Sequence, residues 1–229
     1  MKENFVFILS SMRSGSTLLK ALLATRKDIS NLPEIHFSQI ENISDSSAIK
    51  VIKAPAYYNE FDNYPGKIDI DVKIIVLIRN PYDTIMSLKK MNKEVGISEN
   101  SSLNSFQTLF SYWYYLYINI FDEISNNKNN IIVIRYEELV TNPIQITHSI
   151  FKFIKCQDSI GTDEYDFPKN YKWKWGKDDG GELIKKLKVK DFKRNRDKKE
   201  LINLLKHNED RILELLKLYG YKTIDILEQ

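Results

Sequence analysis

One short polar stretch of the sequence could bind an anion through its backbone. Residues 11–17 read Ser-Met-Arg-Ser-Gly-Ser-Thr and lie between an apolar run and a helical pattern. Gly15 lets the backbone approach a ligand closely, and the N–H groups at a helix start attract negative charge. Arg13 adds a fixed positive fork, and Ser16 and Thr17 add hydroxyl donors. The stretch predicts an anion-binding loop; the alternative is a simple helix cap after a strand.

A second stretch could bind a phosphate. Arg79 ends another apolar run, and Ser87 follows eight residues later on a helical pattern that starts at Pro81. An Arg at a strand end and a Ser early in the next helix can both donate hydrogen bonds to one phosphate. Taken alone, the same residues also fit an ordinary strand-to-helix turn, with Asp83 near the helix start.

The pattern around these stretches predicts an α/β fold. Continuous apolar runs are typical of parallel strands that are buried on both faces. They lie at 4–10, 48–55, 72–81 and 129–137. Helical patterns lie at 16–26, 81–92, 102–125, 142–155 and 197–220. The alternation predicts a three-layer, P-loop-like fold with a central parallel sheet of about four or five strands, whose ligands bind beyond the carboxyl ends of the strands.

The composition predicts one domain over 1–229. The chain has 34 Lys and Arg against 31 Asp and Glu, a net charge of +3, which does not favour nucleic acid as a partner. No apolar run approaches the ~20 residues of a membrane helix, so no membrane partner is expected either. The single cysteine, Cys156, excludes an internal disulfide, indicates a reducing, cytoplasmic location, and is a poor nucleophile candidate in its amphipathic helix.

One segment differs from the rest. Residues 158–196 are polar and Lys-rich, are punctuated by glycines, and contain Trp173 and Trp175. Such a segment could close as a mobile lid over a ligand, or it could be a solvated surface loop.

Together, these stretches resemble a known family. The chain resembles the sulfotransferases that use 3′-phosphoadenosine 5′-phosphosulfate (PAPS) in three segments. The first follows the family pattern strand–[KR]SG[ST]T–helix, and the second follows strand–RNPxDxxxS. The third, "IRYEELVTNP" at 134–143, is similar to another family segment. Three pieces in the family's order are far more specific than one. The resemblance covers roughly 5–154 and the final helix.

The resemblance implies a cofactor site for PAPS and for its product, adenosine 3′,5′-bisphosphate (PAP). The first element would hold the 5′-phosphosulfate, the second the 3′-phosphate, and Tyr136 would lie by the adenine. A basic residue of a C-terminal loop, Lys177 or Lys185, would complete the 3′-phosphate site. The implied cofactor-binding residues are Arg13, Ser14, Gly15, Ser16, Thr17, Leu18, Arg79, Ser87, Tyr136 and Lys177. No metal is required, because a phosphosulfate loop has no Mg²⁺ to place.

The general base departs from the commonest family pattern. Many members carry a His in a Lys-Thr-His arrangement, where this chain has Lys53-Ala54-Pro55. Glu34, 21 residues after Arg13, resembles the base of the carbohydrate and protein-tyrosine sulfotransferases. We therefore expect Glu34 to accept the acceptor's proton and Lys53 to stabilise the leaving phosphate, with Arg13 beside it. His36 is the rival base; its alternative is a packing role, and that of Glu34 is an exposed loop carboxylate.

The predicted activity is that of a PAPS-dependent O-sulfotransferase. The expected partner is a hydroxyl-bearing acceptor, a small metabolite or a carbohydrate by preference. The alternatives are a P-loop kinase or NTPase, and a non-catalytic nucleotide-binding protein on the same fold. The absent GK[ST] lettering speaks against the kinase. The sequence makes no prediction of oligomeric state.

Overall fold

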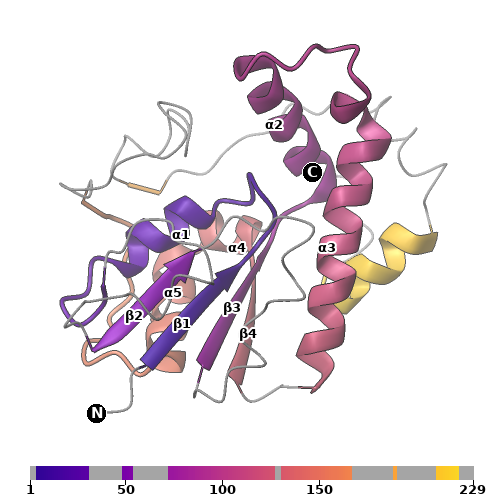
Figure 1. Ribbon diagram of the computed structural model, residues 1–229. Coiled ribbons are helices and arrows are strands. Elements are labelled where there is room, and N and C mark those ends of the chain that lie inside the picture. Colours follow the sequence, from indigo (N-terminus) through magenta and orange to yellow (C-terminus); the bar gives the residue numbers. More distant parts are fainter. Residues whose placement is uncertain are drawn as a thin grey trace.

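The computed structural model of the chain describes residues 4–30, 48–53, 72–126, 130–166, 188–189 and 210–221. Within them, four strands form one sheet, in the order β2-β1-β3-β4, with every neighbouring pair parallel (Figure 1). The strands are β1 (Asn4–Leu9), β2 (Ile49–Lys53), β3 (Val72–Ile78) and β4 (Ile131–Arg135). The predicted α/β class, with a parallel sheet between helices, is confirmed.

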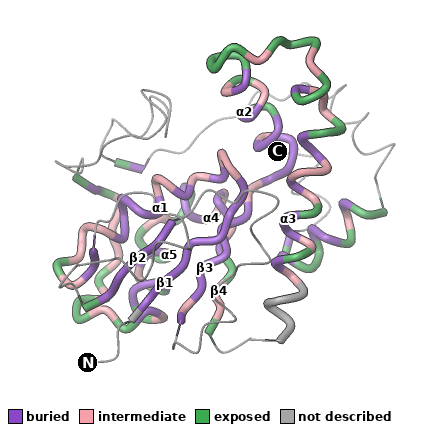
Figure 2. The backbone as a smooth tube through the Cα atoms, in the orientation of Figure 1, coloured by how far each residue is buried: buried purple, intermediate pink, exposed green. Residues whose placement is uncertain are grey.

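Helices cover both faces of this sheet. The side chains of Phe5 and Phe7 join a core cluster with α3 (Phe106–Asn126) and the helix at 210–218, whereas the alternate side chains of Val6 and Ile8 join the other cluster. That second cluster contains α1, α4 and α5, which lie together on one face in Figure 1. Their bounds are Ser16–Leu23, Tyr136–Thr141 and Pro143–Phe153. Figure 2 shows β1 and β3 buried between the layers, as their unbroken apolar sequence requires.

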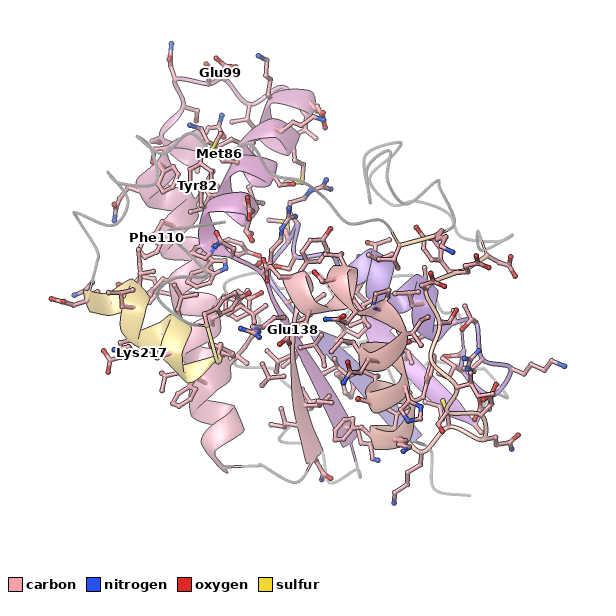
Figure 3. All side chains as sticks on the ribbon, turned by 180° about the vertical axis from the view of Figure 1, so that it is seen from behind. Tyr82, Met86, Glu99, Phe110, Glu138 and Lys217 are labelled. Atoms are coloured by element: carbon pink, nitrogen blue, oxygen red, sulfur yellow. The ribbon has the colours of Figure 1, made fainter. Side chains whose placement is uncertain are left out.

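The helix α2 (Pro81–Glu94) starts directly after β3 because its first turn is well capped. The Asn80 side chain accepts hydrogen bonds from the backbone N–H groups of Tyr82 and Asp83, and Pro81 occupies a position where no donor is lost. Tyr82 and, on α3, Phe110 belong to the same core cluster (Figure 3). A 3-10 turn, η4 (Ser102–Asn104), leads into α3. The cap thus fixes the start of α2, the helix that carries Ser87.

Several predicted boundaries were wrong, including the end of the helix expected at 16–26, since α1 ends at Leu23. The run at 129–137 was expected to be all strand, but β4 ends at Arg135 and α4 begins at Tyr136. The acidic Glu137 and Glu138 fall in the first turn of that helix, where the helix dipole favours them. The pattern at 102–125 was expected to be one helix, but it divides into η4 and α3.

Candidate functional site

The loop after β1 has the backbone of an anion site. Arg13 and Gly15 both adopt positive φ angles, of 65° and 90°, which turn the chain into α1. The first bond of this helix runs from the N–H of Leu19 to the carbonyl of Gly15, at 3.0 Å. The preceding N–H groups, from Ser16 to Leu18, therefore have no acceptor within the helix. Together with the helix dipole, they can bind an anion.

Ser14 contributes differently. Its N–H donates to the Ser11 carbonyl at 3.4 Å, and its fully buried hydroxyl contacts the hydroxyls of Ser11 and Tyr117. Both polar groups of Ser14 thus lie beneath the loop.

Gly15 lies directly against the ring of Tyr136. A Cβ atom at Gly15 would lie 2.4 Å from Cδ2 and 2.5 Å from Cε2 of that ring. The guanidinium of Arg79 lies over the same ring, with its Cζ 4.5 Å from the ring centroid. Tyr136, at the start of α4, thereby joins the first motif to the second.

The two predicted motifs also interlock through their arginines. The Arg79 guanidinium donates to the carbonyl of Arg13 at 2.8 Å, and Arg13 Nε donates to the hydroxyl of Ser87 at 3.1 Å. Arg79 Nε is buried and has no hydrogen-bond partner among the described residues. A buried cationic donor of this kind suits an anionic ligand.

Lys53 approaches the same loop from the neighbouring strand. It pairs in register with Ile8 of β1, and its Nζ donates to the hydroxyl of Thr17 at 2.8 Å. The Lys53 residue is only 6% exposed, so its charge is held next to the loop and not in bulk water. Three strand ends thus bring Arg13, Thr17, Lys53 and Arg79 to one edge of the sheet.

Some predicted site residues lie outside the described residues. These are Glu34, His36 and Lys177, together with Lys185, Trp173 and Trp175. Their roles stay predictions.

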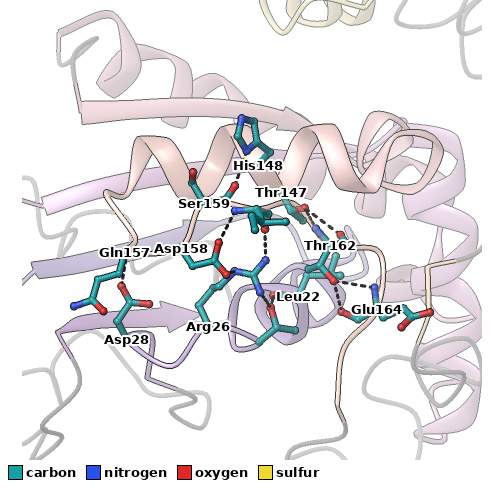
Figure 4. A network of polar contacts seen from close by, with 12 residues as sticks. Leu22, Arg26, Asp28, Thr147, His148, Gln157, Asp158, Ser159, Thr162 and Glu164 are labelled. Atoms are coloured by element: carbon teal, nitrogen blue, oxygen red, sulfur yellow. Dashed lines mark hydrogen bonds and ion pairs between the residues drawn. The ribbon is translucent and has the colours of Figure 1, made fainter.

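The start of the segment predicted as a lid or surface loop is bonded to α5 and to Arg26, which follows α1 (Figure 4). The Thr147 hydroxyl accepts from the N–H of Thr162 at 2.8 Å and lies 3.0 Å from its carbonyl. Asp158 lies 3.7 Å from Arg26 Nε, and His148 contacts the carbonyl of Ser159. Residues 167–187 and 190–209 lie outside the described residues, so closure of a lid stays a prediction.

Glu137 is a site-supporting residue that the sequence did not single out. Its Oε1 accepts from the Asn80 N–H at 3.0 Å, next to Arg79, and its Oε2 accepts from the Tyr221 hydroxyl at 2.7 Å. Burial, and then the Glu137 charge, raise the pKa of Tyr221 well above its usual value, so Tyr221 remains a donor. The only sequence signal was an acidic residue beside the predicted adenine tyrosine.

The described residues contain neither a metal-binding cluster nor a membrane-spanning helix. No three His, Cys, Asp or Glu side chains in them gather in a group that could hold a metal ion. None of the helices in these ranges combines the length and the hydropathy that spanning a membrane requires.

Comparison with known proteins places the chain in a family. The model of the sulfotransferase domain matches residues 3–201, most of the chain. No curated protein sequence gives a match.

Solved structures of the same fold agree. The sulfotransferase domain of the Synechococcus PCC 7002 olefin synthase is 19% identical over 97% of both chains, with a TM-score of 0.61. A sulfotransferase from Alicyclobacillus acidocaldarius is 17% identical over 99% of both chains, with a TM-score of 0.58. Mouse sulfotransferase SULT7A1, solved in complex with PAP, is 16% identical over 69% of this chain and 60% of its own, with a TM-score of 0.53. At these identities the likeness establishes the fold, and the domain match establishes the family. The chain belongs to the sulfotransferase family and is a sulfotransferase enzyme.

Proposed function

We propose that this sulfotransferase transfers a sulfuryl group from PAPS to a hydroxyl acceptor and releases PAP. The observation that carries the proposal is the meeting of Arg13, Lys53 and Arg79 with the first-turn N–H groups of α1 at one edge of the sheet. A nucleotide with anionic groups at both its 5′ and its 3′ position needs a positive site for each. The α1 N-terminus and the Arg79–Ser87 pair supply them.

The 5′ end of the nucleotide is assigned to the loop. The N–H groups of Ser16, Thr17 and Leu18 would bind the phosphosulfate oxygens. Lys53, held at Thr17, would stabilise the negative charge that develops on the leaving phosphate, with Arg13 beside it. Because N–H groups and fixed cations supply this charge stabilisation, no metal ion is needed.

The 3′ end is assigned to Arg79, Ser87 and Lys177. The buried Nε of Arg79 supports this assignment. Tyr136, which packs against Gly15 and Arg79 and so joins the two motifs, is proposed to lie beside the adenine. The complex of SULT7A1 with PAP supports the choice of nucleotide, since that protein shares the fold.

Glu34 is the proposed general base, with His36 as its rival. Ile29 bridges in parallel to Ile49, and the Ser30 N–H donates to the Ile49 carbonyl at 2.8 Å. Glu34 follows Ser30 by four residues, a stretch that can span up to about 14 Å. Lys53 also follows Ile49 by four residues, so the chain is long enough for Glu34 to reach the reacting group.

In the reaction, the acceptor oxygen forms a bond to sulfur while the bond from sulfur to the phosphate oxygen breaks. The carboxylate of Glu34 takes the proton of the acceptor hydroxyl, and the departing oxygen remains with PAP. As acceptor we propose a small metabolite or a carbohydrate, because the Glu34 segment is similar to that of carbohydrate enzymes. The single Cys156 supports a cytoplasmic setting.

The test compares PAP with 5′-AMP, which lacks the 3′-phosphate, in titration calorimetry with EDTA. Arg79→Ala should weaken PAP binding by about 10–100-fold, the worth of charge-assisted hydrogen bonds. Because Arg79 also donates to the Arg13 carbonyl, Arg79→Ala should weaken 5′-AMP binding somewhat as well. The assignment is therefore judged by comparing the loss of affinity for PAP with the loss for 5′-AMP. A larger loss for PAP than for 5′-AMP supports the assignment. Equal losses for both nucleotides would contradict it.

A further inference from the structure

The long helix α3 presents a row of aromatic side chains to the two strand ends that carry the site. The Tyr112 hydroxyl accepts from the backbone N–H of Met12 at 2.9 Å. The Trp113 indole donates to the carbonyl of Arg79 at 3.2 Å. The polar groups at the ends of these aromatic side chains thus form hydrogen bonds with backbone groups of both proposed nucleotide-binding motifs. These contacts are unnecessary for burying the rings, which the core cluster already accomplishes.

Tyr117 has the largest share of these contacts. Its hydroxyl donates to the carbonyl of Leu77 in β3 at 2.8 Å and accepts from the N–H of Ser11 at 3.2 Å. It also lies 3.1 Å from the hydroxyl of Ser14. A phenol has one proton and two lone pairs, so the proton given to Leu77 leaves Tyr117 to accept from Ser11 and Ser14. One buried hydroxyl therefore ties the end of β1, the loop and β3 together.

The strength of this tie follows from its surroundings. Tyr117 is fully buried, and burial is the main cause that raises the pKa of its phenol. The hydroxyl therefore stays neutral and keeps its donor proton at physiological pH. In a dry environment an unmade hydrogen bond costs more than at the surface, so the Ser11 N–H and the Ser14 hydroxyl are held strongly in place.

We propose that Tyr117 is a positioning residue for the 5′-phosphosulfate loop, holding Ser11 and Ser14 so that the N–H groups of the α1 start point at the ligand. The inference rests on the proposed function, because it assumes that this loop binds the 5′ group. Tyr117 itself touches no reacting atom in this account. By holding the loop in place before the anion binds, Tyr117 reduces the entropic cost of binding.

The test uses Tyr117→Phe, which keeps the ring and removes only the hydroxyl. Tyr219→Phe is the matched control: Tyr219 is also buried in the same cluster, and its hydroxyl donates its proton to the Tyr117 carbonyl at 2.6 Å. Both variants should lower the melting temperature. The informative quantity is the ratio of affinities for PAP and for 3′-AMP, which lacks the 5′-phosphate.

For Tyr117→Phe we expect the ratio of the PAP affinity to the 3′-AMP affinity to fall by about five- to tenfold. This is the effect expected from the loss of one buried hydrogen bond. For Tyr219→Phe the ratio should stay within about twofold of wild type. A Tyr117→Phe protein that melts earlier yet keeps the wild-type ratio would overturn the inference. If Tyr117→Phe does not fold, the partly buried Tyr112→Phe replaces it, with the same expected direction and the same overturning result.

The outcome for wild type separates the two proposals. If wild-type protein binds PAP and 3′-AMP equally, the loop does not bind the 5′-phosphate; the proposed function fails, and this inference with it. If wild type prefers PAP and only the Tyr117 result is negative, the proposed function stands and the positioning role alone is overturned.

Discussion

Replacing Gly15 by alanine should damage the site through two separable costs. The first is the backbone: φ at Gly15 is 90°, and a residue with a Cβ pays roughly 1–2 kcal/mol there. The second is steric: the new Cβ would lie 2.4 Å from the ring of Tyr136, and overpacking of this kind costs about 1–3 kcal/mol. We therefore expect Gly15→Ala to lower the free energy of unfolding by roughly 2–5 kcal/mol.

Gly96 offers a control for the backbone cost alone. Its φ is 85°, nearly that of Gly15, and nothing lies within 4 Å of a Cβ built there. Gly96→Ala should therefore show only the first cost, and should leave PAP binding unchanged. The difference between the two variants measures the clash with Tyr136.

Urea unfolding gives the two free energies, and calorimetry with PAP gives the affinities. If Gly15→Ala displaces Tyr136, it also disturbs the stacked Arg79, so PAP binding should weaken by more than tenfold. In a Tyr136→Ala background, the cost of Gly15→Ala should shrink to that of Gly96→Ala. Equal costs for Gly15→Ala and Gly96→Ala in the native background, with PAP binding intact, would refute the close packing of loop and ring.

Three further outcomes are expected. Glu34→Gln should reduce turnover by about 10²-fold or more while the Kd for PAP stays within about twofold; unchanged turnover in the presence of acceptor would exclude Glu34 as the base. Burial raises the pKa of Cys156 to about 12, so iodoacetamide should label it on the order of a thousandfold more slowly at pH 8.5 than in the unfolded chain; similar rates would show that the thiol is accessible and ordinary. Because the pKa of Tyr221 is raised, its contribution to stability is present below pH ~10 and is lost as the pH rises further. The unfolding free energy should fall above that pH, less steeply in Tyr221→Phe, and an equal slope in both proteins would contradict this.

Much of the fold was predictable because it depends on local sequence. The unbroken apolar runs have few alternatives to buried parallel strands, and the Asn80-Pro81 cap fixes the start of α2. The two phosphate motifs were also recognisable, because each combines one element end with residues adjacent in sequence. The joint action of Arg79 and Ser87 on one phosphate stays a prediction, and the bond from Arg13 to Ser87 was not foreseen.

The long-range contacts of the site could not be predicted in the same way. The bonds from Tyr117 to Ser11 and to Leu77 depend on the register of α3 against two strands, which no local pattern specifies. The helix α3 is rich in tyrosines; its Trp113 is fully buried, whereas its Tyr115 is exposed. One signal in the sequence was overlooked. Buried tyrosine hydroxyls need hydrogen-bond partners, so a buried helix rich in tyrosines should contact backbone groups that are not used in strand pairing. Glu137 escaped notice because its two partners come from elements far apart in the chain.

The most direct test of the central claim is thermal unfolding of the wild-type protein with PAP, ADP or ATP, each with EDTA and with Mg²⁺. A ligand that binds the native state raises the melting temperature by mass action. The account predicts that PAP stabilises the protein strongly in EDTA, that added Mg²⁺ changes little, and that ADP, which lacks the 3′-phosphate, stabilises it much less. Stabilisation by ATP that needs Mg²⁺, together with indifference to the 3′-phosphate, would contradict the assignment of this site to PAPS.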